Sequence, residues 1–205
     1  VEAEVVRLSL ARREALVEIA KSRLEFAVRR MESVREGFAQ DLVSIREFAR
    51  MQLEVAEAEM ELAVRESELN EARITGREPD DDLTAPSIKG HDFVTERLEL
   101  RRDPLARRVV SAADHFERME KLRATGQVSF SEAEAVRFAL LEAELALRNL
   151  DEQMALRKLV LAGHLTDDQA ALRGMRIAAQ NPRVRAGPTG EPSASRQRRI
   201  ARVGS

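Results

Sequence analysis

The fold class is decided by residues 130–161, which read FSEAEAVRFALLEAELALRNLDEQMALRKLVL. Apolar side chains recur along this stretch four and three residues apart, and Arg157 is the one break in the pattern. The repeating positions are Ala133, Val136, Leu140, Ala143, Leu147, Leu150, Met154 and Leu161. This spacing is typical of a helix that packs along one seam against another helix. At 1.5 Å per residue it would be roughly 50 Å long, so we expect a partner helix of similar length.

The same rhythm occurs three more times. It runs through residues 6–38, where Arg13 is the one exception, through residues 44–74, and through residues 105–119. A Pro- and Gly-containing stretch, residues 75–91, then predicts a connecting loop whose acidic triplet is solvated. After it we expect a short helix over residues 92–102 and a new long helix starting at Asp103-Pro104, since a carboxylate can cap a helix and proline fits its first position.

Two turns carry the same signal. Ser44 precedes Glu47 by three residues, and Ser129 precedes Glu132 in the same way, each after an apolar residue. This pattern predicts a hydrophobic staple and a capping box at the start of a helix. The two serines are 85 residues apart, and similar Glu-Ala-Glu tripeptides downstream keep that offset. A duplicated helical hairpin accounts for both observations.

The sequence therefore predicts an all-α protein of long antiparallel helical hairpins, coiled-coil-like and duplicated, that form a bundle. The expected divisions are hairpin 1 over 1–74, a linker over 75–91, hairpin 2 over 92–162, a short C-terminal helix over 163–179, and a disordered Arg-rich tail over 180–205.

The composition narrows the possible functions. The 205 residues include no Cys, which excludes disulfides and thiolate metal sites, and no apolar run of 18 residues that would span a membrane. Of the three His, His91 and His115 have no His, Asp or Glu three or four residues away, and His164 lies in a predicted turn and not on one helix with Asp167 and Asp168. Ser129 has no neighbouring base and is accounted for as a cap. We expect no enzyme activity, no cofactor, no metal and no small-molecule substrate.

A resemblance to two families suggests a role. Residues 126–147, starting GQVSFSE, look like the repeated periplasmic hairpin of TolC-type outer-membrane efflux proteins, and residues 42–62 resemble it less closely. Arg118, Leu122 and Ser129 have the spacing found at the hairpin tips of periplasmic adaptor (membrane fusion) proteins. The chain has neither the length and membrane strands of the first family nor the lipoyl-like and β-barrel segments of the second.

What the resemblance implies is a non-catalytic interaction or scaffold protein of the bacterial cell envelope, similar to an efflux component. It would dock a protein partner, or self-associate, through the hairpin tip. The expected contact residues are Arg118, Leu122, Gly126, Val128 and Ser129. Because the chain begins with Val1, we also expect an upstream segment, which would bring the protein near a membrane.

A second hypothesis places the protein in the cytoplasm. Residues 172–205 hold eight Arg and a single Glu, while the whole chain has a net charge of −2. Such a basic tail would attract nucleic acid or an anionic membrane. It has no aromatic residues for base stacking, so a disordered solubilising tail is the more expected interpretation.

Overall fold

The computed structural model describes residues 2–179, which form five α-helices joined by short turns and one longer linker. The helices are α1 (Glu2–Ala39), α2 (Ile45–Thr75), α3 (Phe93–Ala124), α4 (Phe130–Leu161) and α5 (Asp167–Ala179). The predicted basic tail, 180–205, lies outside the described residues.

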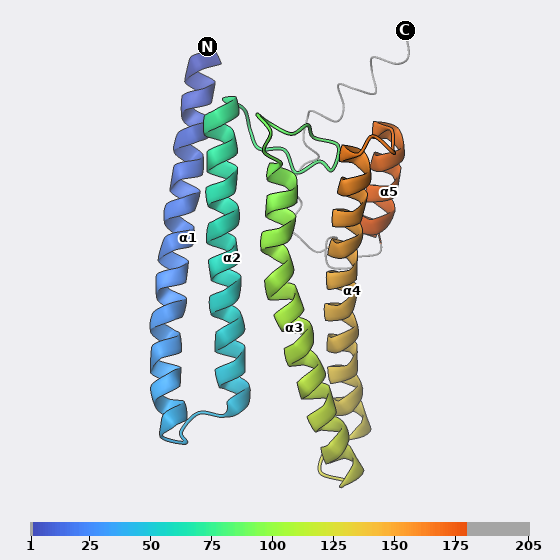
Figure 1. Cartoon of the computed structure of the whole chain (residues 1–205). Helices are drawn as coiled ribbons and strands as arrows, with labels where there is room; N and C mark the ends of the chain where they lie inside the picture. Colours follow the sequence, from blue (N-terminus) through green and yellow to red (C-terminus); the bar gives the residue numbers. More distant parts are fainter. Residues whose placement is uncertain (1, 180–205) are drawn as a thin grey trace.

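The four long helices lie side by side in one row, and α5 packs beside α4 (Figure 1). The pairs α1–α2 and α3–α4 are antiparallel hairpins, and α2 joins the two pairs by packing on α3. Within residues 2–179, α1 makes no extensive contact with any helix other than α2. The duplicated hairpins expected from the sequence are thus confirmed. The outer side of α1 has no covering helix in the described chain, whereas α5 covers part of α4.

The seams hold small and aliphatic side chains, as the heptads predicted. Val17, Ala20 and Ala27 of α1 are buried against α2, and Ala133, Ala143 and Leu150 of α4 are buried toward α3. Small side chains let two helix backbones approach closely over many turns. The free energy of packing is therefore spread along each hairpin and is not concentrated in one large core.

The helix starts follow the predicted caps. The Ser44 hydroxyl accepts a hydrogen bond from the Glu47 N–H at 3.2 Å. Ser129 and Glu132 form a complete capping box, in which each side chain bonds the other's backbone N–H. The same reciprocal pair, Thr166 with Gln169, starts α5.

One predicted boundary was wrong. Residues 92–102 are not a separate short helix, because α3 runs without a break from Phe93 to Ala124 and contains Pro104. The cap is Asp92, whose side chain accepts a hydrogen bond from the Thr95 N–H at 3.3 Å. Proline inside a helix removes one backbone hydrogen bond, but the ring of Pro104 is buried, so packing offsets part of that loss.

Three arginines from three helices hold the linker in place. Arg97 of α3 is fully buried, and it bonds Glu71 at 2.6 Å, Asp81 at 2.7 Å and the Asp80 carbonyl at 2.9 Å. The predicted solvated triplet is indeed exposed. Asp81 nevertheless bridges two arginines, since Arg101 also bonds it at 3.2 Å.

Arg157 of α4 holds the second half of the linker. Its side chain is 1% exposed and donates to both carboxylate oxygens of Asp92, at 2.6 and 3.2 Å, and to the carbonyls of Leu83 and Ala85. Arg13 of α1 holds the first half through Glu78 and also bonds Glu68 of α2 at 2.7 Å. The two residues that interrupt the heptads, Arg13 and Arg157, are therefore structural ion-pair residues.

These contacts shift the pKa values of the linker acids. Burial alone would raise the pKa of Asp92, but hydrogen bonds from Arg157 and Thr95 bring it below its ordinary value. Burial likewise opposes the ionised form of Asp81, yet the charges of Arg101 and Arg97 lower its pKa. Beside this network lies an apolar cluster of Ala85, Val94, Leu98 and Leu150, so the linker end combines buried ion pairs with an apolar core.

Candidate functional site

The tip of the α3–α4 hairpin is closed by backbone hydrogen bonds. The Leu122 carbonyl accepts from the Gln127 N–H at 2.9 Å, and the Arg123 carbonyl accepts from the Gly126 N–H at 3.0 Å. Gly126 has a φ of 71°, a left-handed conformation that favours glycine. Gly126 is therefore explained by the turn itself, whether or not a partner contacts it.

Ser129 is also committed to the turn. Its hydroxyl lies 2.7 Å from the Glu132 carboxylate and 3.1 Å from the Ser131 hydroxyl, and it accepts from the Glu132 N–H. Hydrogen bonds from the backbone and side chain of Ser129 lower the pKa of Glu132. Ser129 therefore shapes the tip, and its direct contact with a partner stays a prediction.

Arg118 and Leu122 lie one helical turn apart near the end of α3. Both are exposed, and Arg118 donates no hydrogen bond to another residue of the described chain. Val128 is half-buried at the base of the turn. Among the five predicted residues, Arg118 and Leu122 are thus the two whose side chains are open to a partner.

An apolar residue that the sequence analysis did not select lies beside them. Phe130, the first residue of α4, is 65% exposed, and its ring lies 6.0 Å from the guanidinium carbon of Arg123. The sequence did contain a signal for this exposure, because Phe130 directly follows the capping Ser129. A side chain on the first helical turn at a tip has few neighbours to cover it.

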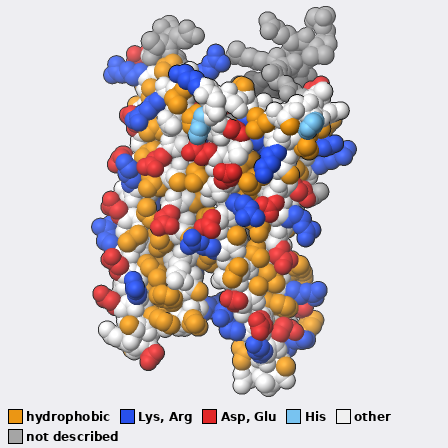
Figure 2. All heavy atoms as spheres, in the orientation of Figure 1, with side chains coloured by type: hydrophobic (Ala, Val, Ile, Leu, Met, Phe, Trp, Pro, Cys, Tyr) orange, Lys and Arg blue, Asp and Glu red, His pale blue; other side chains and the backbone are white. Residues whose placement is uncertain are grey.

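The tip of the α1–α2 hairpin is more apolar still. Leu42 is 77% exposed and Ile45 is 61% exposed, while the rings of Phe38 and Phe48 stack with centroids 4.7 Å apart. Both tips lie at the same end of the molecule, opposite the linker, and the α3–α4 tip extends further (Figure 1). Figure 2 shows hydrophobic side chains reaching the surface over the lower halves of both hairpins. We call these two tips together the tip end.

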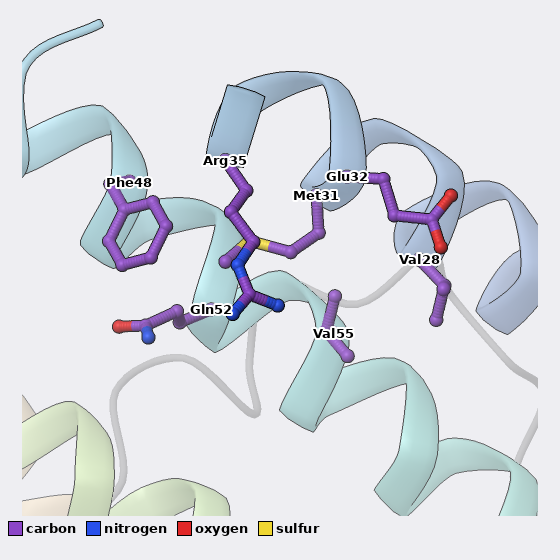
Figure 3. A pocket seen from close by; sticks show the side chains of 7 residues that line it. All are labelled: Val28, Met31, Glu32, Arg35, Phe48, Gln52 and Val55. Atoms are coloured by element: carbon purple, nitrogen blue, oxygen red, sulfur yellow. The ribbon is translucent and has the colours of Figure 1, made fainter. Parts of the chain in front are cut away.

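A shallow groove leads from the first tip along the α1–α2 seam. Its volume is about 430 Å³. Val28, Met31 and Val55 form its apolar floor, Phe48 closes one side, and Glu32, Arg35 and Gln52 make a polar rim (Figure 3). An apolar floor with a polar rim suits an aliphatic side chain of a protein partner.

Positive charge lies between the two hairpins near this end. Burial lowers the pKa of His115, and the nearby charges of Arg46 on α2 and Arg118 on α3 lower it further. A half-buried histidine between two arginines remains neutral at pH 7. The tip end therefore combines exposed apolar side chains with arginines, a pattern that suits a partner with acidic groups around an apolar surface.

The described residues contain no group of three or more His, Asp or Glu arranged to hold a metal ion. None of the helices in that part of the chain combines the length and the apolar character that crossing a bilayer would require.

Comparisons with protein-family models, with curated proteins and with solved structures give no match to this chain. The likeness of residues 118–147 to the two efflux-related families therefore stays a prediction from sequence, as does the envelope location drawn from it.

Proposed function

We propose that this chain is a non-catalytic interaction protein that docks a protein partner through its tip end. The observation that carries the proposal is that the two most exposed large apolar residues of the described chain, Leu42 at 77% and Phe130 at 65%, lie one at each tip. Ile45, 61% exposed, lies beside Leu42, and all three are in the first turn of a helix or in the turn before it, at one end of the molecule. Exposed apolar side chains gathered in one place mark interaction surfaces in soluble proteins.

The architecture supports this role. The linker end is fixed by buried arginines, so the two hairpins project from a rigid base and hold their tips in a defined relation. The partner surface would be apolar and rimmed by carboxylates, because Arg46 adjoins the exposed Ile45 in the chain and Arg118 lies one helical turn from the exposed Leu122. A bacterial envelope location is part of the proposal and is supported by the resemblance of the α3–α4 turn alone.

Photo-crosslinking in cells of the native host tests the proposal. A photoreactive phenylalanine analogue replaces Ile45, Phe130 or, as a control, Val110 in the middle of α3, which at 61% is as exposed as the tip residues. We expect Ile45 and Phe130 to give an adduct with the same partner and Val110 to give none. Equal adducts from Val110, or no adduct from either tip, would contradict the proposal.

Substitutions separate recognition from folding. Arg118→Asp and Leu122→Asp should reduce the yield of the Phe130 adduct without changing helicity, since both side chains are exposed. Ser129→Ala should lower stability by about 1 kcal/mol through loss of the cap, and its adduct yield shows whether Ser129 also contacts the partner. Cell fractionation tests the location, and a gel shift with and without residues 180–205 tests the nucleic-acid alternative.

A further inference from the structure

The outer side of α1 carries an apolar stripe with no neighbour in the described chain. Leu8, Ile19 and Phe26 are 62%, 49% and 56% exposed and stand eleven and seven residues apart, so they share one side of the helix. Val17 and Ala20, which pack on α2, lie on the other side. The stripe is therefore separate from the hairpin seam and from the tip end, since α1 forms one edge of the row (Figure 1).

This stripe has the positions of a heptad. One register position, d, holds Leu8, Ala15, Ser22 and Arg29. The other, a, holds Arg12, Ile19, Phe26 and Ser33. Ile19 places a β-branched residue at a, which in parallel two-stranded coils is combined with Leu at d, and Leu8 is the Leu at d in this stripe. Ala15 and Ser22 at d are small and exposed, which lets a second backbone approach closely.

The surface between these positions is already hollowed. A depression of about 430 Å³ is lined by Ile19, Ser22, Arg23 and Phe26, with Glu18 beside them. Residues spaced i, i+3, i+4 and i+7 are the four that surround an inserted side chain in knobs-into-holes packing. The depression thus has the composition of one hole of a coiled coil, and no residue of the described chain fills it.

The charged residues beside the stripe favour a parallel orientation of the second helix. Glu18 and Glu25 lie along one flank, at g positions, and Arg23 and Arg30 lie along the other, at e positions. In a parallel pair each g residue faces the e residue five places on in the second helix, so Glu18 meets Arg23 and Glu25 meets Arg30 of the second copy. In an antiparallel pair, glutamates would face glutamates and arginines would face arginines.

The arginines keep capacity for these contacts. Within the chain, Arg23 bonds Glu61 and Arg30 bonds Glu54, each through one terminal nitrogen at 2.7 Å. A guanidinium has five N–H donors, so each arginine retains donors for a second carboxylate.

We propose that α1 pairs with α1 of a second copy of this chain in a parallel, in-register homodimer centred on Ile19, Ser22 and Phe26. This inference goes beyond the tip-docking role and does not depend on it, since the dimer contact uses the outer side of α1 and not the tip end. The apolar contact is small, so we expect a weak dimer that dissociates on dilution. Parallel pairing places the tip ends of both copies at the same end of the dimer.

Disulfide crosslinking tests the orientation. The chain has no Cys, so an introduced thiol is the only one present. Ala15→Cys and Ser22→Cys lie seven residues apart at equivalent positions, about 10 Å along the helix. Under mild oxidation we expect both variants to form covalent dimers well above the level of Asp114→Cys, an exposed control on α3. An antiparallel pair would let at most one of the two positions meet itself.

Analytical sedimentation tests whether the outer side of α1 forms the dimer contact. Phe26→Glu should raise the dimer dissociation constant at least tenfold while preserving helicity, because the Phe26 side chain is exposed. Val110→Glu on α3 is the matched control and should leave association unchanged. The proposal is overturned if only one cysteine variant, or neither, crosslinks above the control, or if Phe26→Glu self-associates as the unchanged chain does.

Discussion

Replacing Arg157 by Met removes the arginine that ties α4 to the linker and keeps a side chain of similar length. Four hydrogen bonds are lost, two to Asp92 and one each to the carbonyls of Leu83 and Ala85. The Asp92 carboxylate then remains largely buried without its cation. Breaking a buried ion pair on one side costs about 3–5 kcal/mol. For a chain of this length each kcal/mol lowers the melting temperature by about 2–4 °C, so we expect a fall of about 6–20 °C.

A matched control exists in the same hairpin. Arg102 bonds Asp151 at 2.8 Å, but these side chains are 50% and 44% exposed, so Arg102→Met should cost no more than about 1 kcal/mol. Urea unfolding followed by helical circular dichroism measures both free energies of unfolding. Adding Asp92→Asn to Arg157→Met should restore part of the loss, because Asn still caps α3 and no longer leaves a buried charge. If Arg157→Met costs no more than Arg102→Met, the ion pair does not hold the linker and the argument fails.

Two further predictions concern pH and a buried amide. Asp81 and Asp92 have pKa values lowered by folding, so the stability they contribute is present above the unfolded value of about 3.9 and is lost as the pH falls through the folded pKa values. Urea midpoints between pH 6 and pH 2 should drop steeply below about pH 4, and an Asp81→Asn/Asp92→Asn variant should show a shallower drop. Asn149 of α4 is buried with neither side-chain polar atom hydrogen-bonded within residues 2–179. Asn149→Asp should therefore lose about 3 kcal/mol or more at pH 7 and recover as the acid is protonated, whereas Asn149→Ala should stay within about 1 kcal/mol, and a loss from Ala as large as from Asp would contradict this.

The helices and turns could be predicted because their signals are local. A heptad and a serine three residues before a glutamate are both read within a few turns of chain, and α4 begins and ends at the residues expected from them. The helix start expected at Asp103-Pro104 was wrong because a continuous α3 buries the proline ring, and this packing overrides the local helix-start signal.

The arginine contacts could not be predicted, since they join distant parts of the chain. Arg13 reaches Glu68, 55 positions away, and Arg157 reaches Asp92, 65 positions away. In the sequence both looked like interruptions of an apolar seam. Only the fold places carboxylates beside each of them, and free backbone carbonyls beside Arg157.

The α3–α4 and α1–α2 tips also separate what local sequence predicts from what depends on the rest of the fold. The sequence located the turn at Gly126 and Ser129 because backbone geometry demands those residues. It did not reveal Phe130 or Leu42 as exposed, because exposure depends on what the neighbouring hairpin covers. The role of the five predicted contact residues stays a prediction.

The arrangement of long helices in a single row, fixed at the linker end, leaves the length of each hairpin adjustable. Adding one heptad to α3 and one to α4 near their turn would carry that tip about 10 Å outward and leave Arg97 and Arg157 at their present sites. The α3–α4 tip already extends past its neighbour (Figure 1). Evolution, or an engineer, can therefore change the reach of one arm in whole-heptad steps while the other arm and the shared base stay as they are.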